Sequence, residues 1–287
     1  MKVLIEPKNK NNLYQNQVDG LILSLKNFST NSISNYSLNE IKQIVEENKK
    51  LEIFVNINKN IFNDELKDLK TILLELDKLD ITGIMFYDLA FLKLKRDLSL
   101  KTDLVWNQTY MVNNYKTCNY YYSQGVKYVL LSKEITIEEI NEILKNVKSK
   151  TMCEVIGYPK VAYSYRKLIT NYYKALDKDP NKKLNIIEKV TNKEYELIED
   201  KNGTSFYLKD LVNGTSIIKD LYEHNLDYII IKEYGIDQEI FKELLIDTKK
   251  YIEGNCLDKN YVKKYQLLGD NTNFFFKKTI YQVKKNG

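Results

Sequence analysis

Three carboxylates lie at or just beyond the ends of short apolar runs, where a parallel sheet would place an active site. Asp88 and Glu134 come just after such runs, and Glu154 lies within another. Carboxylates gathered at one place can share a proton, activate water or hold a divalent cation. Each carboxylate taken alone is typical of a structural partner for a lysine, and it is the set that indicates catalysis. We therefore treat these three residues as the candidate catalytic residues.

Polar side chains at other run ends, and a mixed aromatic and basic segment, indicate where substrate would bind. In residues 158–173, tyrosines alternate with lysines and with Arg166, whose planar guanidinium matches a carboxylate or phosphate. Tyrosines of this kind can stack on unpaired bases. The alternative is a surface loop whose tyrosines pack on the protein and whose cations are solvated. The candidate substrate-binding residues are Asn56, Gln108, Tyr163, Arg166 and Lys232.

Several familiar chemistries are excluded by residue counts. The only histidine is His224, so Ser-His-Asp and Cys-His nucleophile systems have no base, and the H-E-x-x-H zinc motif cannot form. The sequence contains no glycine-rich nucleotide loop. Cys118, Cys153 and Cys256 lie far apart, which supports neither a disulfide framework nor a zinc ribbon. No metal site and no cofactor are assigned from these residues.

The elements that would position these residues alternate between strand and helix. Short runs rich in Val, Ile and Leu are separated by amphipathic helical patterns, as in a parallel sheet. Ser37 with Glu40, and Thr136 with Glu139, form capping boxes that predict helix starts. Eight runs match a TIM-like (β/α)8 barrel, whose active site lies at the carboxyl ends of the strands. The runs are Lys2–Ile5, Gly20–Leu25, Leu51–Asn56, Gly83–Tyr87, Leu104–Asn107, Tyr128–Ser132, Met152–Ile156 and Tyr228–Lys232.

Two places depart from a regular barrel. The polar stretch 6–19 is too short for a full first helix, so we expect distortion there. About 70 extra residues separate the seventh and eighth runs, beyond an ordinary connection. Within them Asn202-Gly203 lies between two β-prone runs and predicts a β-hairpin. We therefore expect one barrel domain over residues 1–270, with an insertion at about 173–210, and a basic tail over 271–287.

Charge and hydropathy bound the setting. The formal charge of the 287 residues is +5, and four lysines in the last eleven residues leave +1 for residues 1–276. The body is thus no basic nucleic-acid surface, although the tail could act as a weak electrostatic arm. No stretch approaches the roughly 20 apolar residues that span a bilayer, and the N-terminal apolar run is too short for a signal peptide. We expect a cytoplasmic protein with no membrane partner.

The order of these elements and several motifs resemble the peptidase U32 family, also called collagenase-like proteases. The resemblance covers nearly the whole chain and implies a TIM-like barrel. It rests on the ordered set of motifs, since none of them is specific alone. The matching motifs are Val55–Asn58, Phe86–Leu89, Val129–Thr136, Glu154–Gly157, Tyr163–Tyr172, Glu199–Thr204 and Ile230–Lys232.

The resemblance implies two kinds of function. The family label implies a hydrolase acting on peptides, with no assigned mechanism. Other members imply a factor for hydroxylation of wobble uridines in tRNA, or a non-catalytic partner of a second U32 subunit. Many members carry cysteines where this chain has Lys160 and Lys167, so it is similar to the short, cysteine-poor subgroup, and an iron–sulfur cluster is not expected. The implied substrate is a peptide or a tRNA.

Overall fold

A closed barrel of eight parallel strands forms the body of the protein. The computed structural model describes residues 1–30, 34–108, 110–181, 183–254 and 259–269, so the predicted tail and Cys256 lie outside the described residues. The strands follow the order β7-β13-β1-β2-β3-β4-β5-β6, and β6 pairs back with β7. This confirms the predicted TIM-like fold. The strands are β1 (Lys2–Glu6), β2 (Gly20–Ser24), β3 (Glu52–Ile57), β4 (Gly83–Phe86), β5 (Asp103–Trp106), β6 (Val126–Leu130), β7 (Lys150–Gly157) and β13 (Tyr228–Lys232).

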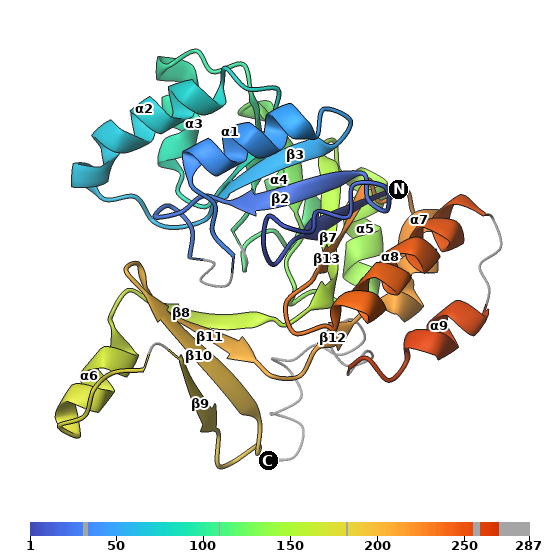
Figure 1. Ribbon diagram of the computed structural model, residues 1–287. Coiled ribbons are helices and arrows are strands. Elements are labelled where there is room, and N and C mark those ends of the chain that lie inside the picture. The colour runs from blue at the N-terminus through green and yellow to red at the C-terminus, as the bar shows by residue number, and fades with distance from the viewer. Residues whose placement is uncertain (31–33, 109, 182, 255–258, 270–287) are drawn as a thin grey trace.

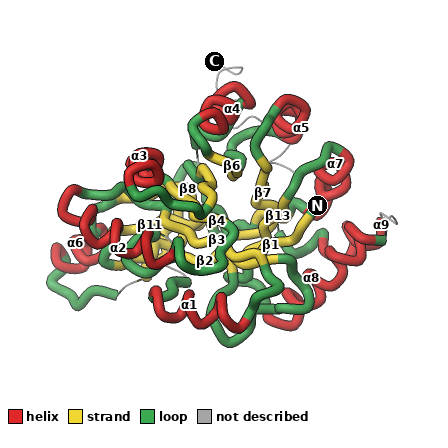
Figure 2. Tube along the Cα trace, turned by 90° about the horizontal axis from the view of Figure 1, so that it is seen from above, coloured by secondary structure: helices red, strands yellow, loops and turns green. Residues whose placement is uncertain are grey.

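Helices surround the barrel, as Figure 2 shows. Both predicted capping boxes are present, Ser37 with Glu40 and Thr136 with Glu139. Two 3-10 turns, η1 (Asn63–Glu65) and η2 (Thr215–Ile217), precede α2 and α7. The outer helices are α1 (Leu38–Glu47), α2 (Leu66–Leu76), α3 (Ala90–Asp97), α4 (Tyr115–Ser123), α5 (Ile137–Asn146), α7 (Ile218–Glu223), α8 (Gln238–Glu253) and α9 (Lys259–Tyr265).

Apolar side chains fill both sides of the barrel wall, because every strand is buried on two faces. The outer face packs on helix stripes such as Leu69, Leu73 and Leu76 of α2. A separate cluster fills the inside and ends below the carboxyl ends of the strands. Its members are Leu4, Ile22, Phe54, Met85, Val105, Tyr128, Met152, Tyr228 and Ile230.

The first βα unit lacks its helix, as predicted. β1 is followed directly by β2 in the order of elements, and the connecting loop buries Leu13, Tyr14 and Val18 in place of a helix face. The Tyr14 hydroxyl donates a 2.8 Å hydrogen bond to Glu233 beyond β13. This hydrogen bond links the loop after the first barrel strand to the residue that follows the last barrel strand.

The insertion between β7 and β13 is a second sheet. Its antiparallel order is β8 (Lys160–Ser164), β11 (Gly203–Leu208), β10 (Glu194–Asp200) and β9 (Lys183–Ile187). The predicted hairpin is β10–β11. The sheet also includes β8, which lies before the range expected for the insertion, because β8 pairs with β11 some 40 residues later. A helix, α6 (Leu168–Ala175), follows β8, and a short strand, β12 (Val212–Asn213), pairs with β7.

The insertion lies across one end of the barrel (Figure 1). The Asn202 side chain at the hairpin tip donates to the Ser29 carbonyl at 2.9 Å, and Ser205 donates to the Thr30 carbonyl at 3.0 Å. Lys160 of β8 donates to the Thr30 hydroxyl at 2.5 Å. Since Ser29 and Thr30 follow β2, the insertion is held against the carboxyl ends of the barrel strands.

The hairpin tip requires a glycine at position 203. Gly203 has φ +134°, and a Cβ there would lie 2.2 Å from the Ser164 carbonyl oxygen of β8. We expect Gly203→Ala to lower the free energy of unfolding by about 3 kcal/mol, because backbone strain and displacement of β8 add together. Urea unfolding measures the change.

Gly125 offers the matched control. Its φ is +88°, but a Cβ there would meet nothing within 4 Å. Gly125→Ala should therefore cost only about 1 kcal/mol, for the left-handed backbone alone. Equal losses in the two variants would show that the contact between β8 and the hairpin tip contributes nothing.

Candidate active site at the mouth of the barrel

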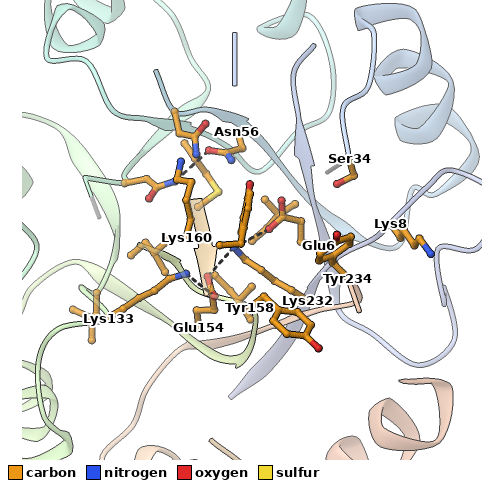
Figure 3. Close-up of a pocket in the computed structure, with 18 residues that line it drawn as sticks. Glu6, Lys8, Ser34, Asn56, Lys133, Glu154, Tyr158, Lys160, Lys232 and Tyr234 are labelled. Atoms are coloured by element: carbon orange, nitrogen blue, oxygen red, sulfur yellow. Dashed lines mark hydrogen bonds and ion pairs between the residues drawn. The ribbon is translucent and has the colours of Figure 1, made fainter. Parts of the chain in front are cut away.

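A pocket lies between the carboxyl ends of the barrel strands and the insertion. It measures about 940 Å³ including its open mouth, within the range of small-molecule sites. Figure 3 shows the side chains that line it. The barrel contributes polar residues above a floor of apolar ones, and the insertion contributes Lys160 and Tyr207. The floor consists of Ile22, Met85, Leu130 and Ile230.

A buried carboxylate joins two lysines at the centre of the pocket. Glu154 of β7 accepts from Lys133 at 2.6 Å on one oxygen and from Lys232 at 2.9 Å on the other. Lys232 also pairs with Glu6 at 3.1 Å, opposite it in the parallel register of β1 and β13. Lys232 is the last residue of β13, and Lys133 lies just after the end of β6. Both lysines therefore project from the carboxyl ends of barrel strands.

The pKa values favour the ionised forms of Glu154 and Lys232, whereas burial lowers the pKa of Lys133. Burial alone would raise the pKa of Glu154, but the ammonium groups of Lys133 and Lys232 outweigh burial and lower it. Burial would lower the pKa of Lys232, but Glu154 and Glu6 outweigh burial and raise it. Glu154 is thus a firmly ionised carboxylate with both oxygens engaged, and such a group is a weak base.

Lys160 is in a different position. Burial, together with the nearby charges of Lys232 and Lys133, lowers its pKa to about 7, and the opposing effects of Glu6 and Glu154 are smaller. Four lysines, Lys8, Lys133, Lys160 and Lys232, and two glutamates, Glu6 and Glu154, line this pocket. The surplus of cationic groups favours a ligand that carries negative charge.

Amide side chains form a second polar group above the floor. Asn107 donates to Asn56 at 3.2 Å, and Asn56 donates to Ser24 at 3.2 Å, so the two amides hold each other in place. Within the part of the chain that the structure describes, Oε1 of Glu6 is buried without a hydrogen-bond partner. Buried acceptors are nearly always paired, so this oxygen is available to a donor group on a ligand.

The structure brings together three of the eight residues predicted to act. Glu154, Asn56 and Lys232 all line the pocket. Tyr163 and Arg166 lie on the insertion, where the Tyr163 hydroxyl donates to the Asn202 carbonyl and Arg166 is exposed. Their predicted role in substrate binding remains a prediction.

The other three predicted residues lie outside the pocket. Asp88 accepts the backbone N–H groups of Ile61 and Ala90, at 2.9 and 2.8 Å, and so orders the loop before α3. Gln108 donates to the Tyr87 carbonyl at 2.6 Å. Glu134 is exposed beyond β6. Their side chains therefore do not gather with Glu154.

Sequence reasoning did not select four charged residues that line the pocket, Glu6, Lys8, Lys133 and Lys160. Lys133 is the neighbour of Glu134, and the choice between them depends on how the chain turns after β6. Glu6 is the last residue of β1, a position that the strand-end argument could have found. Lys160 belongs to the mixed aromatic and basic segment, and its position in the pocket depends on the pairing of β8 with β11.

Among the described residues, no group of three or more His, Cys, Asp or Glu side chains is arranged to hold a metal ion. No helix in the described part of the chain is long and apolar enough to cross a membrane.

The chain is similar to known proteins over much of its length. The family model described as peptidase family U32 matches residues 6–244. A solved structure of a U32 peptidase superposes with a TM-score of 0.50 at 14% identity, covering 82% of this chain and 94% of that one, which shows the shared fold.

Three curated relatives match about half of the chain. The tRNA hydroxylation protein P2 of Bacillus subtilis is 29% identical over 136 residues, 46% of this chain and 44% of P2. The tRNA hydroxylation protein P1 of the same organism is 25% identical over 145 residues, 50% and 34% of the two chains. An uncharacterized protease of Methanocaldococcus jannaschii is 28% identical over 152 residues, 51% and 35%. Each match thus spans less than half of the relative.

The central ion pairs predict a strong effect of one substitution. Glu154→Gln leaves Lys133 and Lys232 without their shared counter-charge, so we expect a loss of about 3 kcal/mol in the free energy of unfolding near pH 7. Because the folded pKa of Glu154 is lowered, its stabilisation is complete above the ordinary value of 4.5 and disappears as the pH falls through the folded value. Chemical denaturation across this range measures the difference.

Glu75→Gln is the control for charge removal at the surface. Glu75 also pairs with two lysines, Lys42 at 2.8 Å and Lys78 at 2.5 Å, but on an exposed helix face. The Glu75→Gln variant should lose much less free energy of unfolding, since ion pairs at the surface contribute little. A Glu154→Gln protein as stable as the Glu75→Gln protein would contradict the role of Glu154.

Proposed function

The chain belongs to peptidase family U32, and on that premise we propose that it acts in the hydroxylation of wobble uridines in tRNA, with a small anionic molecule bound in the barrel pocket. The observation that carries the proposal is the pocket with Lys133, Lys160 and Lys232 at its centre. Two relatives, P1 and P2, are named as tRNA hydroxylation proteins, which supports the choice of substrate.

Peptide hydrolysis has less support from the geometry. General-base hydrolysis requires a group that can take a proton from water near neutral pH. Glu154 is the carboxylate at the centre of the pocket, and two lysines occupy its oxygens and lower its pKa. A group held in this way is suited to fixing cations in place. The pocket therefore favours binding of an anion over activation of water.

A surface for unpaired bases lies on the same side of the barrel. Phe62 follows β3 and Tyr165 follows β8, and the centres of their rings lie 5.0 Å apart. Phe62 is 43% exposed and Tyr165 is 61% exposed. Arg166 and Lys167, also exposed, come next in the chain. Exposed aromatic rings beside cations are the usual features of single-stranded nucleic-acid binding. We place Tyr163 and Arg166 in this RNA-binding surface, as the sequence predicts.

A second subunit of the same family is the partner we propose. The formal charge of residues 1–276 is only +1, which gives weak attraction to RNA. A partner with a more basic surface would supply the missing phosphate contacts. The relatives P1 and P2 come from one organism, which supports a pair of such subunits. The proposal also places the protein in the cytoplasm, where tRNA is modified.

Complementation tests this function. In bacterial cells deleted for their own U32 genes, expression of this chain, with its proposed second subunit, should restore the hydroxylated wobble uridine, as measured by nucleoside mass spectrometry of bulk tRNA. Lys133→Met should reduce that nucleoside at least about tenfold, because losing a charged contact to a bound anion costs roughly 1.4 kcal/mol or more.

Lys127→Met is the matched control. Lys127 lies near the start of β6, at the opposite end of the barrel, and pairs with Asp103 at 2.6 Å. Its removal should leave the nucleoside level unchanged. If the wild-type chain restores no hydroxylated uridine and instead cleaves peptides in a manner that depends on Glu154, the peptidase assignment is correct.

A further inference from the structure

We propose that Lys160 is an amine nucleophile that forms a Schiff base with a 2-oxo acid, a ligand with a carbonyl group next to a carboxylate. The inference rests on the proposed function in that it names the class of small anion that the pocket holds. It also assigns a catalytic role to a residue of the insertion.

The first support is the set of partners around the amine. Lys160 enters the pocket from β8, and its Nζ donates to the neutral hydroxyl of Thr30 at 2.5 Å. Among the described residues Lys160 forms no ion pair, whereas Lys133 and Lys232 each pair with Glu154. Among the described residues, the amine therefore has no carboxylate within ion-pair distance to hold it in the ammonium form.

The second support is the charge that surrounds this amine. The groups that act on it are Lys232 of β13, Lys133 after β6, Glu6 of β1 and Glu154 of β7. The Tyr163 ring of β8 lies 5.7 Å from Nζ. Burial and the two cations lower the pKa of Lys160 to about 7, so much of it is free amine at neutral pH. A lysine beside other cations is activated as a nucleophile in this way.

The third support is the fit of a 2-oxo acid to the rest of the pocket. An ammonium group has three donors, so Lys133 and Lys232 can bind a ligand carboxylate while still holding Glu154. The apolar floor can contact the carbon skeleton.

The step balances without an oxidant or reductant. The free amine adds to the carbonyl carbon as the carbonyl π bond breaks, and one proton passes from nitrogen to oxygen to give a carbinolamine. The C–O bond then breaks, and the hydroxyl leaves as water with a proton from solvent at the open mouth. A protonated imine remains, and it draws electrons from the adjacent carbon atoms.

Borohydride trapping on the purified full chain tests the proposal. The chain is incubated with pyruvate and sodium borohydride, and labelled peptides are mapped by mass spectrometry. We expect one main adduct, on Lys160, formed at least about tenfold faster than with acetone, which lacks the carboxylate. Lactate, which lacks the carbonyl, should give no adduct but should slow labelling by pyruvate. The labelling rate should rise as the pH passes through about 7, where the amine loses its proton.

Two variants complete the design. Lys160→Arg keeps a long hydrogen-bond donor but has no nucleophilic amine, so the adduct should disappear. Lys209→Arg changes another lysine of the insertion, which pairs with Glu194 at the surface, and should leave the adduct unchanged. The mapped site in the wild-type chain decides the question if Lys160→Arg does not fold. Labelling spread over surface lysines, or labelling of Lys160 only as the pH approaches 10, overturns the proposal.

Complementation separates this inference from the proposed function. A Lys160→Arg chain that restores the hydroxylated uridine fully would overturn the Schiff base and leave the RNA function standing. A wild-type chain that forms the adduct on Lys160 but restores no hydroxylated uridine would overturn the RNA function and support the Schiff base. The two failures are therefore distinguishable.

Discussion

The shared ion pair of Glu154 with Lys133 and Lys232 is the interaction on which the site depends. Burying two ammonium groups near each other costs several kcal/mol unless a counter-charge lies between them. Glu154 supplies that charge from the middle of β7, between the end of β6 and β13. The lysines can then remain charged under the insertion and present their remaining donors to a ligand. The carboxylate is thus a structural requirement of a cationic pocket.

The barrel and the insertion contribute different parts of one site. The barrel strands end in the residues that bind charge, while the insertion adds Lys160 and Tyr207 and covers the mouth. The contacts of the hairpin tip with Ser29 and Thr30 hold the two parts together. A regular barrel with short loops would leave the same strand ends open to water, where a lysine has its ordinary pKa.

The sequence predicted the fold well because apolar runs and capping residues are local signals. Three of the residues it selected, Asn56, Glu154 and Lys232, line one pocket, since the carboxyl ends of barrel strands converge. It did not distinguish Lys133 from Glu134. These two residues are adjacent in the loop after β6, and the path of that loop determines which side chain points into the pocket. The inward position of Lys160 depends on the pairing of β8 with β11, a long-range contact with no local signature.

The attachment of Lys160 to the insertion, and not to the barrel, has a further consequence. The residues that lower its pKa, Lys133 and Lys232, belong to the barrel, and its burial comes from the docked sheet. If the hairpin tip moved away from Ser29 and Thr30, the amine would leave both the cations and the shielded space at once. It would then regain its proton in water. In this geometry the reactivity of the Lys160 amine therefore depends on the docking of the insertion against the barrel.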